Sequence, residues 1–375
     1  MDSLQRARLI RTLLLSLFAL SAAACRGGGG GGGGAPPPPP PPPAEWLIDE
    51  NFIFDGGPGA DGIPSLENPN FESASTISTV NPDDLAVAVK HAGEVKIYPQ
   101  DIMDWHEIVN DGPDDDPMTL SYCPLTGSAT AWKGTIAHAN QSFGVSGLLY
   151  NSNLLLYDRE TRSLWSQMYE AAVFGPRIRE LPDRLQLIEA KFGTLRGMFP
   201  DAMTMNRATG FIRDYPQYPY GNYREAAGLL YPVTNADNRM HPKTRVIGVR
   251  DGEGVDDTVT AKVYQLGGFG DSTVAINDQV GNLSIVVVGN TALDFAVIYD
   301  RELEDGTILT FSPIEGDGAN IMRDDEGNVW DAFGMAVSGP RAGTQLSMTN
   351  SYTAFWFAWV AHFPDSDFHF SVFGP

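Results

Sequence analysis

The sequence predicts a mainly β protein with short helices, of the α+β class, made of two tandem pseudo-repeat halves that pack together. From Glu45 onward, short β-branched or alternating runs are separated by Gly, Pro, Asn and Asp, and long helical periods are rare. Short strings recur in the same order in both halves. The chain has 375 residues, 42% of them apolar, which is enough to bury a large core.

Charge and cysteine content exclude several classes of function. The chain has 47 acidic against 25 basic residues, and a surface this acidic repels phosphate backbones. We therefore expect no nucleic acid partner. The two cysteines, Cys25 and Cys123, are too few for a disulfide framework or a multi-thiolate zinc site.

Residues 1–24 are typical of a secretory signal peptide. Three arginines precede an apolar run, Leu13–Leu20, that is too short to span a membrane. Small residues directly before Cys25 resemble a bacterial lipobox, so we expect export, cleavage and lipidation of Cys25. Ordinary signal cleavage next to an incidental cysteine is the alternative.

Residues 25–44 are interpreted as the lipid-anchor cysteine followed by a tether. Eight glycines, Gly27–Gly34, precede eight prolines, Pro36–Pro43. Such runs form a flexible coil and an extended polyproline rod. The expected product is a membrane-anchored lipoprotein of the bacterial cell envelope, with a small molecule or an envelope protein as its partner.

The folded body is expected to consist of an N-terminal extension, a first repeat half, a connector and a second, degenerate repeat half, at residues 45–82, 83–205, 206–243 and 244–375. Glu94–Tyr98 matches Ala261–Tyr264, and Ile108–Asp111 matches Ala275–Asp278. These and further matches in one order predict a tandem duplication. The Tyr/Pro/Gly-rich connector lacks an apolar period and is expected to be irregular and to pack on both halves.

A short helix is predicted around His106. Ile102, Trp105, His106 and Val109 are spaced i, i+3, i+4 and i+7, so a helix would turn them all inward. An inward histidine is either a satisfied core residue or a base, acid or ligand that faces a cleft. The second half has no histidine at the equivalent position, so chemistry is expected in the first half.

Cys123 is the second candidate. The predicted strand Met118–Tyr122 runs into Cys123-Pro-Leu-Thr-Gly127, where Pro124 favours a tight turn or a helix start with backbone N–H groups that stabilise a thiolate. Thr126 occupies the position of the second thiol in a Cys-x-x-Cys turn, so it is expected to hydrogen-bond the sulfur without forming a disulfide. A buried, inert cysteine is the alternative.

Further candidates lie in the stretch from Phe143 to Gln167. The amide of Gln167 is peculiar to the first half and is expected to donate to a bound oxyanion or peroxide. Trp165 recurs as Trp330 in the second half, which favours packing over catalysis. Contacts to a substrate are expected from Tyr122, Ser146, Asn151, Arg159 and Trp165.

The chain resembles the bacterial family catalogued as domain of unknown function 3179, from about Gly56 to Asp365. The motifs that carry the resemblance are Asp61–Pro64, Trp105–Asp111, Tyr122–Gly127, Ser146–Leu149, Tyr157–Arg159, Ser163–Gln167 and Trp356–Trp359. Members are often exported and some are regarded as selenoproteins, which implies redox use of a Cys or Sec position. Many members have Cys-Pro-Leu-Cys where this chain has Cys-Pro-Leu-Thr, so an internal disulfide cycle is not expected here.

Two hypotheses for function follow. In the first, a thiol-dependent redox protein uses Cys123 as nucleophile, His106 as the base or cation that lowers the pKa of the thiol, and Thr126 and Gln167 as hydrogen-bonding groups. A copper site with Cys123 and His106 as ligands fits the same residues. In the second, a non-enzymatic lipoprotein binds a ligand or partner between its two halves. The sequence specifies no cofactor.

Overall fold

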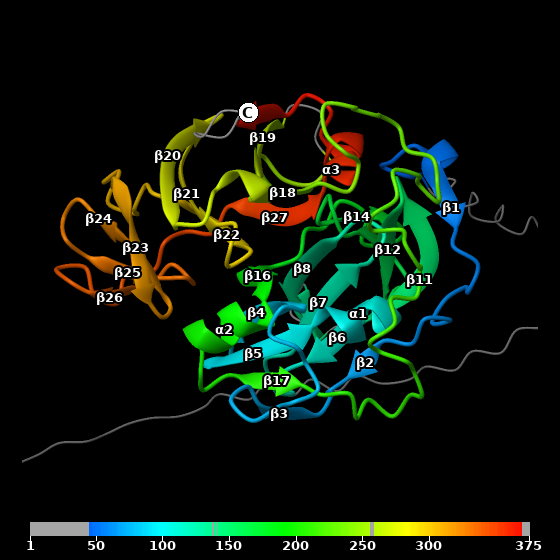
Figure 1. Cartoon of the computed structure of the whole chain (residues 1–375). Helices are drawn as coiled ribbons and strands as arrows, with labels where there is room; N and C mark the ends of the chain where they lie inside the picture. Colours follow the sequence, from blue (N-terminus) through cyan, green and yellow to red (C-terminus); the bar gives the residue numbers. More distant parts are fainter. Residues whose placement is uncertain (1–44, 137–138, 141, 256–258, 370–375) are drawn as a thin grey trace, which may run out of the picture. The chain divides into compact units, whose positions relative to one another are not determined.

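The computed structural model describes residues 45–369 apart from 137–138, 141 and 256–258. The expected signal peptide, the lipid-anchor residue Cys25 and the tether lie outside the described residues. The described part is mainly β, as predicted, with three α-helices of seven residues each (Figure 1). None of the helices in this part is long and apolar enough to cross a membrane.

The first half contains a five-stranded sheet in the order β16-β4-β5-β17-β3. Its strands are β16 (Leu187–Lys191), β4 (Leu85–His91), β5 (Glu94–Pro99), β17 (Met203–Met205) and β3 (Phe71–Ser73). Alternate residues of a strand point to opposite faces. Ala86 and Ala88 of β4 accordingly belong to one core cluster, and Val87 and Val89 to another. The sheet is therefore covered on both faces.

Helices α1 (Gln100–His106) and α2 (Phe192–Met198) directly follow strands β5 and β16. Helix α1 is shorter than its apolar spacing predicts, because Glu107 adopts φ 59° and ends the helix. Val109 therefore lies in strand β6 and not on the helix, which corrects the predicted position of that residue. Ile102 and His106 are buried as expected.

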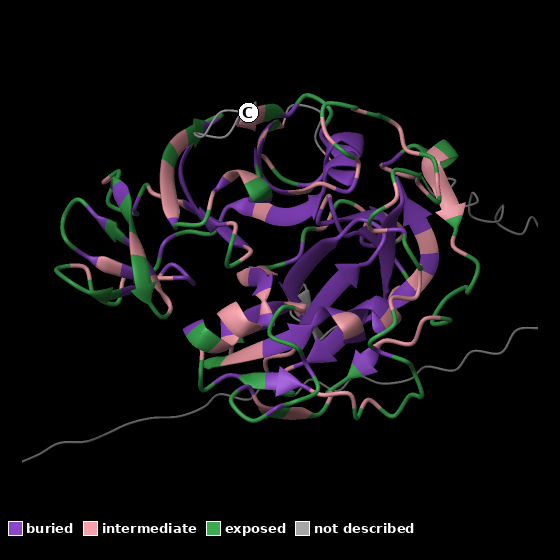
Figure 2. Ribbon diagram, viewed as in Figure 1, coloured by how far each residue is buried: buried purple, intermediate pink, exposed green. Residues whose placement is uncertain are grey.

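Two more five-stranded sheets complete the first half, in the orders β15-β8-β7-β6-β2 and β1-β11-β12-β13-β14. Their strands are β15 (Arg184–Leu185), β8 (Ser128–Lys133), β7 (Met118–Cys123), β6 (Ile108–Asp111), β2 (Leu66–Glu67), β1 (Ile53–Asp55), β11 (Phe143–Tyr150), β12 (Asn153–Asp158), β13 (Leu164–Ser166) and β14 (Ala171–Phe174). The short pair β9 (Thr135–Ile136) and β10 (Ala139–Asn140) and the 3-10 turn η1 (Glu50–Phe52) are peripheral to these sheets. Every residue of β7 and β12 is buried (Figure 2).

The second half has sheets in the orders β27-β18-β19-β28, β20-β21-β22 and β23-β24-β25-β26. The elements are β18 (Arg245–Asp251), β19 (Thr260–Gln265), η2 (Leu266–Gly268), β20 (Val274–Val280), β21 (Leu283–Asn290), β22 (Phe295–Asp300), β23 (Phe311–Asp317), β24 (Asn320–Asp324), β25 (Val329–Asp331), β26 (Ala336–Ser338), β27 (Asn350–Phe355), α3 (Trp356–His362) and β28 (Asp367–His369). Strands β16, β4, β5 and β17 correspond in chain order and pairing to β27, β18, β19 and β28.

Individual hydrogen bonds also recur in the two halves. Lys96 and Tyr98 donate to Asp111 in the first half. Lys262 and Tyr264 donate to Asp278 in the second half. The indole N–H groups of Trp165 and Trp330 donate to Asp158 and Asp324. These correspondences favour the tandem duplication, which stays an inference about the origin of the chain.

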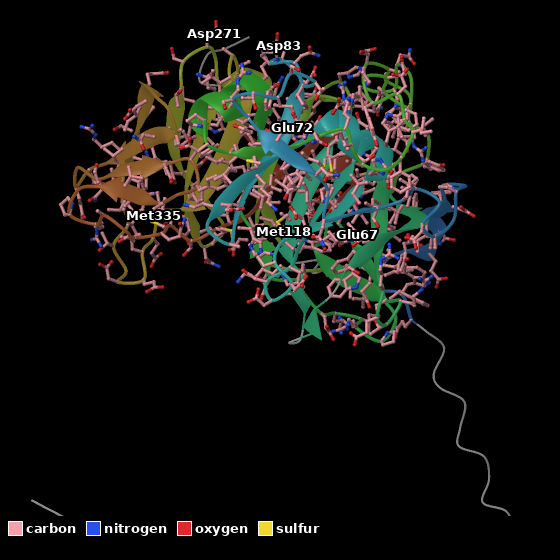
Figure 3. The ribbon with its side chains drawn as sticks, turned by 90° about the horizontal axis from the view of Figure 1, so that it is seen from below. Glu67, Glu72, Asp83, Met118, Asp271 and Met335 are labelled. Atoms are coloured by element: carbon pink, nitrogen blue, oxygen red, sulfur yellow. The ribbon has the colours of Figure 1, made fainter. Side chains whose placement is uncertain are left out.

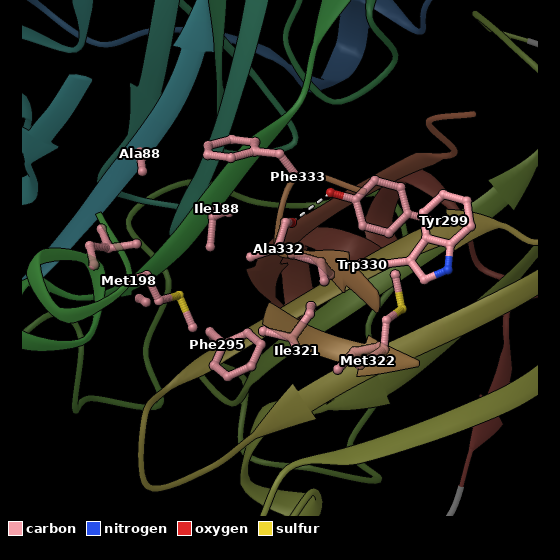
Figure 4. Close-up of a cluster of buried hydrophobic side chains, with 14 of the residues drawn as sticks. Ala88, Ile188, Met198, Phe295, Tyr299, Ile321, Met322, Trp330, Ala332 and Phe333 are labelled. Carbon is pink, nitrogen blue, oxygen red and sulfur yellow. Dashed lines mark hydrogen bonds between the residues drawn. The ribbon is translucent and has the colours of Figure 1, made fainter. Parts of the chain in front are cut away.

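One hydrophobic cluster contains residues of both halves (Figure 4). Ala88, Ile188 and Met198 come from the first half, and Phe295, Tyr299, Ile321, Met322, Trp330, Ala332 and Phe333 come from the second. The Tyr299 hydroxyl donates to the carbonyl of Ala332 over 2.7 Å, so the polar end of this buried ring is satisfied. The shared cluster means that each half completes the core of the other.

The connector has no helix or strand between Met205 and Arg245. It nevertheless contacts both halves, as its composition suggests. The carbonyl of Tyr231 accepts from Ser152 of the first half over 3.0 Å. The Thr234 hydroxyl donates to the carbonyl of Ala361 in the second half over 2.8 Å.

Candidate functional site

Cys123 is the last residue of β7, and its side chain is buried, with 1% of the residue exposed. The thiol donates to the carbonyl of Ser152 at 3.8 Å. Burial, together with the nearby Glu107 carboxylate, raises the pKa of the thiol to about 11. A hydrogen bond from Thr126, the contact expected from the Cys-x-x-Thr spacing, opposes this rise. The thiol is therefore protonated at neutral pH, contrary to the expected thiolate.

The hydrogen bonds of the His106 ring go to residues other than Cys123 in this structure. Its Nδ1 lies 2.8 Å from the carbonyl of Pro64, which only accepts, so Nδ1 carries the proton. Its Nε2 lies 2.8 Å from the hydroxyl of Tyr215 and accepts from it. Burial lowers the pKa of the imidazole. Both ring nitrogens are engaged by Pro64 and Tyr215 in this structure, so the roles of His106 as a base for Cys123 or as a copper ligand stay predictions.

Gln167 belongs to a buried polar network and not to a ligand site. Its Nε2 donates to the Ser121 hydroxyl over 3.0 Å and to the carbonyl of Ser128 over 3.2 Å. Its Oε1 accepts from the Ser128 hydroxyl over 2.8 Å and from Nδ2 of Asn153 over 2.7 Å. The Thr126 hydroxyl is part of the same network, 2.8 Å from that of Ser128. This amide has no hydrogen-bonding capacity left for an oxyanion.

Four residues expected to contact a substrate make contacts within the fold instead. The Ser146 hydroxyl donates to the carbonyl of Leu155, and Asn151 donates to the carbonyl of Ala361. Arg159 pairs with Asp61 at 2.9 Å, and Trp165 is fully buried. Of the five, Tyr122 alone contacts the cluster described next.

A cluster of buried acids lies beside the thiol. Glu107 is buried, and burial raises the pKa of its carboxyl to about 8. Tyr220 of the connector hydrogen-bonds this carboxyl. Asp104, one turn earlier on α1, is also buried, and burial raises the pKa of its carboxyl to about 7. Two acids with pKa values near neutrality in one place are typical of functional sites.

The connector covers this cluster. The Arg224 guanidinium bridges the Asp104 carboxylate at 2.6 Å and the Tyr122 hydroxyl at 3.1 Å, and it lies over the ring of Tyr218, 4.0 Å from the ring centroid. The Tyr218 hydroxyl donates to the carbonyl of Pro124 over 3.0 Å. The connector is thus attached to the turn that carries the thiol.

The second half supports the same turn from another side. The backbone N–H of Phe355 donates to the carbonyl of Thr126 over 2.7 Å. Gly127 adopts φ 57°, and a Cβ at this position would lie 2.8 Å from the ring of Phe355. Only glycine fits between the turn and this ring.

An open pocket of about 550 Å³ adjoins the cluster, and we call it the α1 pocket. It is lined by Ser78, Thr79, Asn81, Asp83, Asp84, Leu85, Gln100, Asp101, Asp104, Arg207, Tyr215, Pro216, Tyr218 and Arg224. Asp101 pairs with Arg207 at 2.5 Å, which places a second ion pair beside that of Asp104 and Arg224. Asp83 lies at the exposed rim, at the outer edge of the view in Figure 3.

The sequence prediction missed the residues that shape this pocket, Asp101, Asp104, Arg207 and Arg224. One signal was available, because Asp101 and Asp104 are spaced i, i+3 on the predicted helix and so share a face. The arginines that pair with them lie more than 100 positions later in the chain, at separations of 106 and 120. No local pattern relates such distant residues.

Comparisons with known proteins agree with the resemblance seen in the sequence. No curated protein and no solved structure matches the chain. A family model described as a protein of unknown function, DUF3179, matches residues 60–366, which is most of the chain, and the protein therefore belongs to this family.

Proposed function

We propose that the protein is an exported, lipid-anchored binding protein of the bacterial cell envelope, and that the α1 pocket holds its ligand. The signal-like segment, Cys25 and the Gly/Pro tether support export and anchoring. The pocket supports binding: its volume of about 550 Å³ lies in the usual range for small-molecule sites, and charged and aromatic side chains converge on it.

The pocket favours a ligand held by the first half and the connector over one held between the halves. Two pockets that the described residues form at the second half have volumes of about 300 and 20 Å³. A further pocket of about 220 Å³ is lined by Lys96, Tyr98 and Asp111. The same three side-chain types bond to each other in the second half, so in this pocket they serve the fold.

A pocket-filling variant tests the proposal. Thr79 is exposed at the pocket, so Thr79→Trp fills it at little cost to folding, and Ser75→Trp is the matched control on the same exposed segment outside the pocket. We expect calorimetry with a panel of neutral sugars, amines and organic acids to find a ligand whose affinity falls at least about 10-fold in Thr79→Trp and is unchanged in Ser75→Trp. A panel in which nothing binds, or equal affinities in both variants, contradicts a binding function for this pocket.

Thiol-dependent redox chemistry is the second candidate, and the position of Cys123 under the connector is the observation that favours it. In its favour, connector residues pack over the turn that carries Cys123, and the contacts of Tyr218 and Arg224 are side-chain hydrogen bonds that a motion can break. Against it stand the 1% exposure and the raised pKa of the thiol. Cys123→Ser separates the two functions: it leaves ligand binding intact if the protein is a binding protein, and it abolishes the activity if the thiol is the functional group.

A further inference from the structure

We propose that the α1 pocket takes a neutral, polyhydroxylated ligand of the saccharide class. This inference rests on the binding function proposed above and names the chemistry of the ligand. It follows from the way in which the charges of the pocket are paired, from the groups left over for hydrogen bonding, and from the rings in its wall.

Three of the four aspartates that line the pocket are paired with basic side chains. Asp101 is paired with Arg207, and Asp104 with Arg224. Asp83 at the rim lies 3.5 Å from Lys191. An anionic ligand would compete with the aspartates for Arg207 or Arg224, and breaking either partly buried pair leaves its aspartate without a counter-charge. A neutral ligand avoids this cost.

An anionic ligand is further disfavoured because more acidic than basic side chains line the pocket. The lining contains four aspartates and two arginines. Asp84 uses one carboxylate oxygen to accept from the backbone and side-chain N–H groups of Asn81, both over 2.9 Å, which holds that oxygen in place. The pocket therefore has an excess of acceptors, and it suits a ligand that donates hydrogen bonds.

The paired charges still have hydrogen-bonding capacity for hydroxyl groups. Arg207 and Arg224 contact their aspartates through Nη2, and among the described residues Oδ1 of Asp101 and Nε of Arg207 are buried without a hydrogen-bond partner. Each pair thus presents donors next to carboxylate acceptors, and a hydroxyl group both donates and accepts. Neighbouring hydroxyls of a sugar match this alternation. Neutral polar side chains at Ser78, Thr79 and Gln100 extend it.

The wall of the α1 pocket also contains apolar side chains against which a sugar ring can pack. Tyr215, Pro216 and Tyr218 line the same pocket. Tyr215 is held by its hydrogen bond to His106, and Tyr218 by its hydrogen bond to the carbonyl of Pro124, so both rings are fixed before a ligand arrives. Arg224 covers one face of the Tyr218 ring and Tyr215 is 4% exposed, so the C–H groups of a pyranose would pack on the atoms of Tyr218 and Pro216 that stay open, at low entropic cost.

Titration calorimetry on the full chain tests this assignment, with D-glucose, N-acetyl-D-glucosamine and trehalose as neutral probes, spermidine as the cation and citrate as the anion. We expect at least one sugar to bind with an affinity that changes less than about twofold between 50 and 500 mM NaCl, because no net charge enters the pocket. Its affinity is expected to fall at least about 10-fold in Thr79→Trp and to stay unchanged in Ser75→Trp.

The possible failures are distinct. If spermidine or citrate binds in a manner sensitive to Thr79→Trp and the sugars do not, the saccharide class is wrong and the binding function survives. If no probe binds, both the class and the proposed binding function are contradicted. If a sugar binds equally well to Thr79→Trp, the ligand lies elsewhere and this site assignment is overturned.

Discussion

At the scale of single residues, the buried environment of Cys123 decides what its thiol can do. A thiol with a pKa of about 11 is almost entirely protonated at pH 8, and its neighbours leave 1% of the residue exposed. The periodicity of the sequence correctly predicted that His106 points inward. It could not predict the direction of the ring nitrogens, because their partners, Pro64 and Tyr215, come from distant segments.

The first prediction concerns the reactivity of this thiol. In a full-length Cys25→Ser chain, Cys123 is the only thiol, and we expect iodoacetamide at pH 8 to alkylate it at least about 100-fold more slowly than free cysteine, because so little thiolate is present. Mass spectrometry of timed samples measures the rate. The same chain in guanidinium chloride is the control and should react like free cysteine. A native rate close to the denatured rate would show that the thiol is open and activated.

The second prediction concerns Glu107. Burial raises the pKa of this carboxyl to about 8 in the folded protein from 4.5 in an unfolded chain, so the unfolded state releases its proton first as pH rises. This carboxyl therefore lowers the stability of the fold progressively between about pH 4.5 and 8. Glu107→Gln removes this loss and retains an oxygen to accept from Tyr220. We expect the variant to gain stability over the wild type between pH 5 and 8, on the order of 3 kcal/mol.

Urea denaturation at both pH values measures that gain. Glu72→Gln, at an exposed position of β3, is the control and should show no comparable trend. A stability difference between Glu107→Gln and the wild type that stays constant from pH 5 to pH 8 would mean that Glu107 ionises normally in the folded state.

At the scale of elements, the connector is the feature that the sequence described least well. Its lack of periodicity correctly indicated an irregular segment, and Tyr/Pro/Gly content indicated that it packs. Its attachment to α1 and β7 includes Arg224, whose partners Asp104 and Tyr122 lie 120 and 102 positions earlier in the chain. Helix α1 was predicted one turn too long, because positive φ at Glu107 has no signature in the residue type.

The third prediction tests the connector as a cover. Arg224→Met removes the bridge to Asp104 and Tyr122 but keeps an apolar stem over the ring of Tyr218. We expect alkylation of Cys123 to become at least about 10-fold faster, since the thiol is reached through an opened connector. Arg239→Met is the matched control, because Arg239 pairs with Asp237 in the same connector. Equal alkylation in both variants, with native circular dichroism, would show that Arg224 does not hold the cover closed.

At the scale of the whole molecule, the two halves share one hydrophobic cluster. The order of the repeated strings indicated two similar halves, and the sheets follow corresponding orders. The sequence could not indicate that Ile188 of one half packs in the same cluster as Phe295 and Trp330 of the other. Such contacts arise only when both halves are folded.

The fourth prediction concerns this shared core. Ile188 is fully buried, and Ile188→Ala is expected to lower the free energy of unfolding by about 2 to 5 kcal/mol, with both halves still melting in one transition. Differential scanning calorimetry measures both quantities. Ile212→Ala, at a residue that is 97% exposed, is the control and should change stability by less than about 0.5 kcal/mol. Two separate melting transitions would mean that the halves fold independently.

The contact between Gly127 and Phe355 has a consequence for how the protein can evolve and move. Phe355 of the second half packs against the turn of the first half that follows Cys123. A shift of one half relative to the other would press Phe355 against the turn at Gly127, next to the end of β7 that carries Cys123. The second half thus supports the turn next to Cys123, and a larger side chain at position 127 would require a smaller one at position 355.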